Sequence, residues 1–269
     1  MNQPKDDWAL PVSEAALTGM TREMDQAHRE AFPRMRALAA EFGEELADTG
    51  AARRPEMARR RFLLGLGGAG AALALAACSS NSSTPGSPAT RAGSGSASAS
   101  SKYVGDLKVV ALATALENQA VGAYQAALAA AKAGKLGTVP PAVATFITTA
   151  MSQHQDHAKA WNAVLTGAGV PAITGVPLSN QAATTQALGQ ATTVADVAKL
   201  ALQLEDQAAE TYLFAAGNVS SAGGIATAAS IAPVEAMHVA ILNFVLGQYP
   251  VPASFLSTDK AAGTTLLTV

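Results

Sequence analysis

Apolar residues recur at steps of three and four along four long stretches between residues 106 and 246. This spacing puts them on one face of an α-helix, and glycine or proline stands near the ends of the stretches. Residues 134 and 137 are glycines, for example, and Pro141 opens the second stretch, where a first-turn proline is tolerated. The pattern predicts four helices, over residues 106–133, 141–166, 194–216 and 225–246.

The connections between these helices are short, long and short. The middle one spans some 25 residues and contains Pro171 and Pro177. Short connections join antiparallel neighbours, whereas a long one carries the chain across a bundle. We therefore expect an all-α, four-helix bundle made of two helical hairpins and one long crossover.

The two hairpins also repeat each other in sequence. Residues 116–120 match residues 204–208, and residues 154–165 match residues 235–246. Each copy holds a first helix with a Glu and a second helix in which a His stands three residues after another polar residue.

Polar residues interrupt the apolar seam of every predicted helix. In the first helix the seam runs Val110, Thr114, Glu117, Val121 and Tyr124, so that the Glu117 side chain points into the core. The other seams carry His154 with His157, then Glu205, and finally Glu235 with His238. Counted from the helix ends, and at about 1.5 Å per residue, these groups lie at similar heights, so we expect them to meet in one layer.

Three carboxylates in a core need a counter-charge, because a buried unpaired ion is costly. No Arg occurs after Arg91, and Lys108, Lys132, Lys159 and Lys199 lie off the seams. A metal cation is the remaining partner, and carboxylate with imidazole suits iron, manganese or zinc. The single Cys excludes a thiolate-rich site.

The set of six residues resembles that of the ferritin-like di-metal carboxylate proteins, in which two helices carry one Glu each and two carry Glu-x-x-His. Glu117 and Glu205 match the single-Glu helices, and residues 235–238 match Glu-x-x-His in full. His157 matches the other family His, but His154 replaces a Glu that usually bridges two metals. The resemblance implies a metal site, mononuclear or dinuclear, and, if the metal reacts with oxygen or peroxide, an oxidoreductase.

The remaining polar and aromatic residues of the domain have simpler interpretations. We expect Asp156, Asp206 and Glu210 to be solvated and Trp161 to lie in the core. Tyr124 and Tyr212 each stand seven residues after a seam Glu, and we expect them to pack in the core with their hydroxyls hydrogen-bonded. A role beside the metal ligands is the alternative. His28 lies outside the predicted bundle and indicates no function.

Charge is concentrated at the other end of the chain. Residues 1–61 hold 21 of its 38 charged residues, and the small net charge of −2 provides no basic surface for nucleic acid. Aromatic residues make up only 5%, and a chain this poor in aromatic residues favours small-residue helices over a sheet.

An export signal precedes the predicted bundle. Arg59 and Arg60 stand before a charge-free run over residues 63–77, which at about 1.5 Å per residue is too short for a membrane span of about 30 Å. The segment resembles a twin-arginine translocation signal, and residues 75–78 resemble a bacterial lipobox, with Cys78 as the lipid attachment residue. Met57 is a natural start for such a signal, so residues 1–56 are either a charged N-terminal extension or no part of the mature protein.

Four segments follow from these patterns: residues 1–56, the signal at 57–78, a Ser/Gly/Pro-rich linker at 79–101, and the helical domain at 102–269. We expect an exported protein that passes the twin-arginine translocase and is anchored by lipid at the outer face of the cytoplasmic membrane. Three functions remain open for its domain: metal-dependent redox chemistry, metal binding without catalysis, and a structural role in the cell envelope.

Overall fold

The computed structural model describes residues 10–48 and 102–269. In these ranges the secondary structure is helical, apart from an isolated bridge between Leu178 and Leu267. The helices are α1 (Glu14–Asp48), α3 (Asp106–Lys132), α4 (Pro141–Gly167), α5 (Gln181–Gln190), α6 (Val194–Asn218) and α7 (Ala222–Val245), followed by the short 3-10 helix η1 (Thr264–Leu266). Arg59, Arg60, Cys78 and the linker at 79–101 lie outside the described residues.

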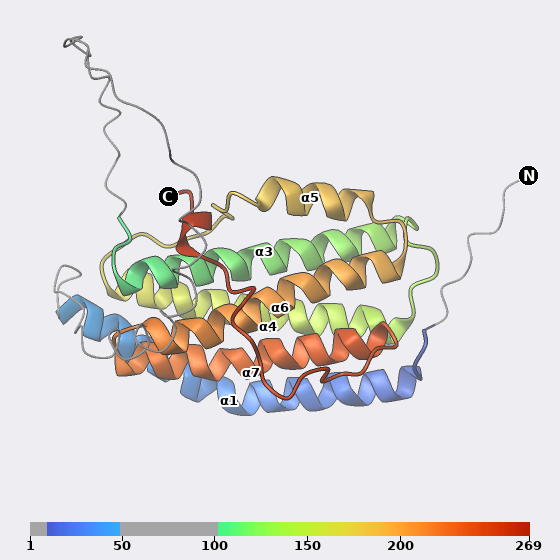
Figure 1. Cartoon of the computed structure of the whole chain (residues 1–269), viewed down its shortest axis with the longest axis horizontal. Coiled ribbons are helices and arrows are strands. Elements are labelled where there is room, and N and C mark those ends of the chain that lie inside the picture. Colours follow the sequence, from blue (N-terminus) through green and yellow to red (C-terminus); the bar gives the residue numbers. More distant parts are fainter. Residues whose placement is uncertain (1–9, 49–101) are drawn as a thin grey trace, which may run out of the picture. The chain divides into compact units, whose positions relative to one another are not determined.

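Two helical hairpins, α3–α4 and α6–α7, form the bundle, and the segment between α4 and α6 is the long crossover (Figure 1). The predicted all-α bundle is therefore confirmed. Its helix ends follow from local chemistry: Gly134 and Gly137 take positive φ after α3, and a reciprocal pair of hydrogen bonds between Thr193 and Asp196 starts α6. Helix α7 begins three residues earlier than predicted, because the Ser221 side chain accepts a hydrogen bond from the Gly224 N–H at 2.9 Å.

The crossover contains a helix that the sequence pattern did not predict. Helix α5 lies along α3 (Figure 1), and none of its residues is buried. It therefore has no apolar stripe that periodicity could reveal. Side-chain hydrogen bonds from Gln119 of α3 to Gln181 and Thr184 hold it instead, at 2.9 and 3.4 Å.

Helix α1 packs against α4 and α7 as part of the same folded unit. Residues 1–56 were not expected to belong to the bundle. In the structure, one helix runs through the exposed Pro33, and its buried face includes Leu17, Met24, Met35 and Phe42.

Glycines allow the close approach of α1. A Cβ atom at Gly43 would lie 3.3 Å from the Cα of Val164 in α4, and one at Gly224 of α7 would lie 2.8 Å from the Phe42 ring. Contacts of this kind indicate a packed interface between α1 and the bundle.

The core of the bundle has two apolar layers. One layer is built around Leu107, Trp161, Val164 and Ile231, and the other around Phe146, Val197, Leu242 and their neighbours. The four predicted site residues on α3, α4 and α6 fall between these two sets, and the two on α7 fall between Ile231 and Leu242. The polar residues thus form a layer inside the core, with apolar packing on both sides.

Helix α7 is the one described helix that is long and apolar enough to cross a membrane by length and composition. It packs against α6 and α1, and it carries Glu235 and His238 on its buried side. A helix that packs against two others in a bundle is also apolar, so the packing of α7 is enough to explain its apolar composition.

Candidate metal centre

The structure brings all six predicted site residues together. Glu117 comes from α3, His154 and His157 from α4, Glu205 from α6, and Glu235 and His238 from α7; each is at most 2% exposed. We call this set the His/Glu cluster. Its members are buried because each stands on its helix's apolar seam at the same level of the bundle.

Two overlapping groups of four residues within the cluster have the spacing of a metal site. In the first group, the quartet Glu117, His154, His157 and Glu235, one potential ligand atom of each residue lies within 4.8 Å of the others. The second quartet, His154, Glu205, Glu235 and His238, meets the same criterion. His154 and Glu235 belong to both quartets, so the two positions are coupled.

The contacts between imidazoles and carboxylates are direct. The Nδ1 atom of His157 is 3.0 Å from Oε1 of Glu235, and the Nδ1 atom of His238 is 3.1 Å from the other carboxylate oxygen, Oε2. Glu235 therefore faces both quartets with one oxygen each. Nδ1 of His238 also lies 3.2 Å from Oε2 of Glu205.

Two tyrosines hold the outer carboxylates in a reciprocal arrangement. The Tyr124 hydroxyl of α3 donates to Oε1 of Glu205 on α6, and the Tyr212 hydroxyl of α6 donates to Oε1 of Glu117 on α3. Burial, followed by the adjacent carboxylate, raises the pKa of both hydroxyls well above the usual range, so they remain donors. Trp161 Nε1 donates to the Tyr212 hydroxyl at 2.9 Å. The expected packing and hydrogen bonding of both tyrosines is observed, and both touch the cluster.

Charge pairing shifts the titration of the cluster. Burial on its own would raise the pKa of Glu117 and Glu205, but the neighbouring histidines lower it, to about 2 for Glu117 beside His157 and well below the usual range for Glu205 beside His154. Burial on its own would lower the pKa of the histidines, but the neighbouring carboxylates raise it. The pKa rises to about 9 for His157 and well above the usual value for His154, and the pKa of His238 is also raised.

Three imidazolium groups can therefore balance three carboxylates in the folded chain. Protonated histidines are thus a second source of counter-charge beside the metal expected from the sequence. A metal that enters the cluster must displace protons from the histidines, because a ligating imidazole needs a free lone pair.

Unpartnered atoms show that protons alone leave the cluster incompletely satisfied. Both ring nitrogens of His157 and the Oε1 atom of Glu235 are buried without a hydrogen-bond partner, although His157 and Glu235 face each other. A buried polar atom without a partner is uncommon in folded proteins. Carboxylate and imidazole donors at this spacing fit iron, manganese or zinc, so the residues present fit a metal ion.

Sequence reasoning missed two polar residues at this site. Gln153 is buried, and its Oε1 lies 2.9 Å from Nε2 of His238, but it stands beside the seam of α4 rather than on it. His28 of α1 is also buried, with its ring centroid 5.3 Å from that of His157. The available signal was its position on the same helical face as Leu17 and Met24.

The expectations for the other acidic residues gave different outcomes. Asp156 pairs with Lys159 at 3.4 Å near the surface, and Asp206 pairs with Lys260, also near the surface. Glu210, expected to be solvated, is only 3% exposed. The C-terminal segment covers it, and its Oε2 accepts the backbone N–H of Lys260 at 2.5 Å.

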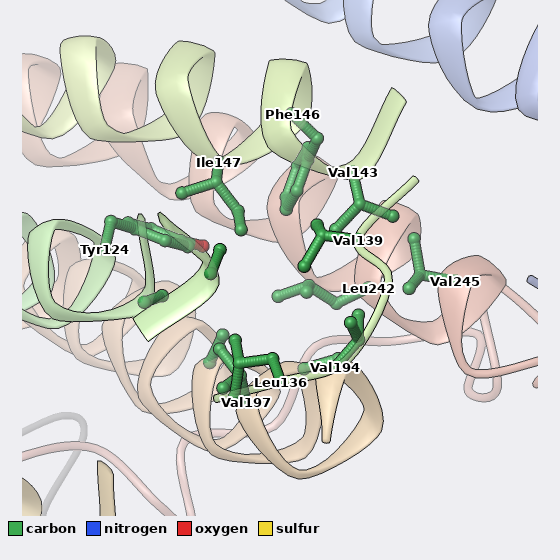
Figure 2. A pocket seen from close by; sticks show the side chains of 14 residues that line it. Tyr124, Leu136, Val139, Val143, Phe146, Ile147, Val194, Val197, Leu242 and Val245 are labelled. Atoms are coloured by element: carbon green, nitrogen blue, oxygen red, sulfur yellow. The ribbon is translucent and has the colours of Figure 1, made fainter. Parts of the chain in front are cut away.

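An apolar pocket adjoins the cluster on one side. It is lined by residues of α3, α4, α6 and α7 and by Leu136 and Val139 of the α3–α4 connection, and its free space is about 20 Å³, room for about one water-sized molecule. Figure 2 shows Tyr124 at its edge, among side chains that include Ile147, Phe146 and Leu242. Since the Tyr124 hydroxyl also binds Glu205, this residue separates the pocket from the cluster.

Comparison with known proteins agrees with this geometry. A family model described as the ferritin-like domain matches residues 105–248, which include α3 to α7 and all six cluster residues but not α1. The searches of curated proteins and of solved structures gave no match.

Proposed function

Because the chain belongs to the ferritin-like domain family, we propose that its His/Glu cluster binds one divalent metal ion tightly, and a second only weakly. The observation that carries this proposal is the pair of buried quartets that share His154 and Glu235. Three carboxylates offset the charge of one divalent ion and leave one negative charge for a retained imidazolium. Two divalent ions would leave the cluster at +1, which is unfavourable in a core.

Iron or manganese is our first assignment for the metal, with zinc as the alternative. Carboxylate oxygens suit manganese, and imidazole suits iron and zinc, so the mixed donor set favours no single ion. Iron or manganese, when bound, would supply one-electron chemistry toward oxygen or peroxide.

The chain's own residues prepare the site for such chemistry. The tyrosine hydroxyls orient Glu117 and Glu205, and the apolar layers exclude water. The pocket beside Tyr124 is apolar and has room for about one water-sized molecule.

The experiment that tests the redox function is oxygen consumption and peroxide turnover by the iron-loaded full chain. We expect turnover that Glu235→Ala abolishes. If the iron-loaded protein shows no turnover above free iron, the supported function is metal binding without catalysis. If the chain binds no metal, the structural role in the cell envelope is the one supported.

We further propose export and lipid anchoring, on the evidence of Arg59, Arg60 and Cys78 in the sequence. Cleavage before Cys78 would release residues 1–77, so an anchored form would keep the six cluster residues and lose α1. Cell fractionation tests this: Cys78→Ala should release the domain from the membrane, and Arg59→Lys combined with Arg60→Lys should block export. Unchanged membrane attachment of Cys78→Ala would contradict the anchor.

A further inference from the structure

The chain leaves α7 by a non-helical segment that leads to η1 (Figure 1). Residues 249–256 of this segment, which we call the apolar loop, contain four large apolar side chains that are exposed: Tyr249, Val251, Phe255 and Leu256. Phe255 is 89% exposed, Tyr249 75% and Val251 60%, and these three are the most exposed large apolar side chains among the described residues. Scattered apolar residues are normal on a surface, but a group of them within one loop marks an interaction surface.

The apolar loop does not belong to the core of the bundle. It stands off α6 and α7 and leaves an open groove with about 440 Å³ of free space, lined on the α7 side by Ala236, Val239 and Ala240. Every residue from 251 to 260 is exposed. Packing in the fold therefore does not explain why this loop carries large apolar side chains.

The apolar loop is also free of charge. No Lys, Arg, Asp or Glu occurs between Glu235 and Asp259. Beside the loop, Asp206 is paired with Lys260, and the Glu210 carboxylate accepts a backbone N–H. A protein interface normally has a polar rim, whereas a loop that enters lipid must avoid charges, because a charged side chain is costly in a bilayer. The composition of the loop favours lipid.

The backbone of the apolar loop also suits an apolar surface. Pro250 and Pro252 have no N–H group, and the Pro250 carbonyl accepts a hydrogen bond from the Asn243 side chain at 3.4 Å. A backbone donor without a partner costs free energy when water is removed, so the two prolines lower the cost of approaching a bilayer. Tyr249 has an amphipathic ring of the kind that is enriched at membrane–water interfaces.

The proposed lipid on Cys78 would bring the domain close to a membrane. Residues 79–101 connect Cys78 to the domain, and a chain of that length spans at most about 80 Å. The apolar loop follows Cys78 in the sequence, so cleavage before this residue retains the loop, whereas it removes α1.

We propose that the apolar loop inserts its side chains into the interfacial region of a lipid bilayer and so orients the domain on the membrane. A single small apolar anchor gives only weak binding, so the lipid on Cys78 supplies the attachment and the loop supplies the orientation. Because the loop is uncharged, its insertion needs no anionic lipid and is insensitive to salt. The inference rests on the proposed lipid anchoring for its setting in the cell, but the affinity of the loop for lipid does not depend on that anchor.

Site-specific fluorescence on the full chain tests the proposal. Cys78 is the only cysteine, so Cys78→Ala combined with Ser254→Cys gives one labelling position inside the apolar loop. The matched control is Cys78→Ala combined with Gln186→Cys, at an exposed position of α5. Each chain carries an environment-sensitive dye and is mixed with phosphatidylcholine vesicles, with and without spin-labelled lipid. We expect a blue shift and quenching by the spin-labelled lipid at position 254 but not at position 186, at low and high salt alike.

A substitution in the apolar loop tests which side chain inserts. Phe255→Ser in the chain labelled at position 254 should lower the equilibrium constant for insertion by about tenfold or more, because burial of a phenyl ring contributes at least that factor. Val104→Ser, at an exposed apolar position outside the loop, should leave insertion unchanged. Since Phe255 is exposed, its replacement should leave the urea midpoint unchanged. The run at residues 63–77 is common to all these chains, so differences between them report on the loop.

Several outcomes would overturn the proposal. These are no response at position 254, an equal response at positions 254 and 186, or a response that requires anionic lipid. A response at position 254 that appears without vesicles as the protein is concentrated would also overturn it, because the loop would then bind a second copy of the chain. Absence of lipid on Cys78 in cells would refute the proposed anchoring instead and would leave the vesicle result standing.

Discussion

The Nδ1 atom of His154 lies 2.7 Å from Oε2 of Glu117, and its other ring nitrogen, Nε2, lies 3.0 Å from Oε1 of Glu205. One imidazole thus connects the carboxylates of the first helices of both hairpins. In the ferritin-like pattern a Glu stands at this position, so the neutral or cationic ring removes a negative charge from the centre of the site.

Restoring that charge should change the number of bound metals. With His154→Glu the cluster holds four carboxylates, which balance two divalent ions without another anion. We expect the metal-to-protein ratio after dialysis to rise from about one towards two, measured by elemental analysis of the full chain. A ratio that stays at one would show that charge does not limit the second position.

Glu235→Ala should remove most of the bound metal, because Glu235 contributes to both quartets. It also leaves His157 and His238 without their shared carboxylate. Breaking a buried ion pair costs about 3–5 kcal/mol, so we expect a loss of this order in the unfolding free energy of the metal-free protein. Urea unfolding measures it, with the exposed Glu23→Ala of α1 as the control. Normal metal content in Glu235→Ala would refute our assignment of the ligands.

The metal-free chain should be most stable between about pH 4.5 and 6.5. The pKa of His157 is raised from 6.5 to about 9, and that of His154 is raised well above 6.5, so their stabilisation is complete below pH 6.5 and is lost as pH rises through the folded-state values. The pKa of Glu117 is lowered from 4.5 to about 2, so its contribution is lost as pH falls below 4.5.

His28 limits stability on the acidic side as well. Its pKa is lowered to about 4, so the unfolded chain binds a proton below pH 6.5 that the folded chain excludes. Urea midpoints between pH 4 and 9, measured with a chelator present, should pass through a maximum between about pH 4.5 and 6.5. A midpoint that rises steadily from pH 6.5 to 9 would contradict the charge pairing in the cluster.

The two cluster tyrosines should differ in their contribution to stability. Tyr124→Phe removes one hydroxyl donor from Glu205, whereas Tyr212→Phe removes a donor from Glu117 and also leaves the Trp161 indole N–H without its acceptor. A hydrogen bond to a charged group contributes about 1.5–3 kcal/mol, and an unsatisfied buried donor costs about 1–3 kcal/mol more. We therefore expect the greater loss of unfolding free energy for Tyr212→Phe.

Tyr103→Phe is the reference for this comparison. It deletes a hydroxyl that donates to the Pro171 carbonyl at 3.0 Å, so the acceptor is uncharged. We expect a loss of about 1 kcal/mol there. Equal losses for Tyr212→Phe and Tyr103→Phe would show that the bonds to Glu117 and Trp161 add nothing.

The sequence predicted the four bundle helices and the meeting of the six cluster residues because both depend on local periodicity. A Glu or His on a helix face whose apolar residues are spaced three and four apart is buried wherever that face packs. The internal sequence repeat places the six cluster residues at matching heights along their helices. Gln153 was missed because it stands off the seam, and α5 was missed because side-chain hydrogen bonds rather than a buried face hold it.

Contacts between distant parts of the chain account for the other errors. Glu210 is buried by a segment about fifty residues away, which no local pattern reveals. Helix α1 has an apolar stripe, but its charges and its separation from the bundle by more than fifty residues concealed its place against α4. The environment of His28 depends on that packing and could be found only in the folded chain.

Elemental analysis of the purified full chain after dialysis is the most direct test of the central claim that the His/Glu cluster is a metal centre. We predict about one iron, manganese or zinc ion per chain, with any second ion removed first by a chelator. Two ions held equally tightly would contradict the charge argument, and a folded chain that takes up none of these metals would contradict the metal centre itself.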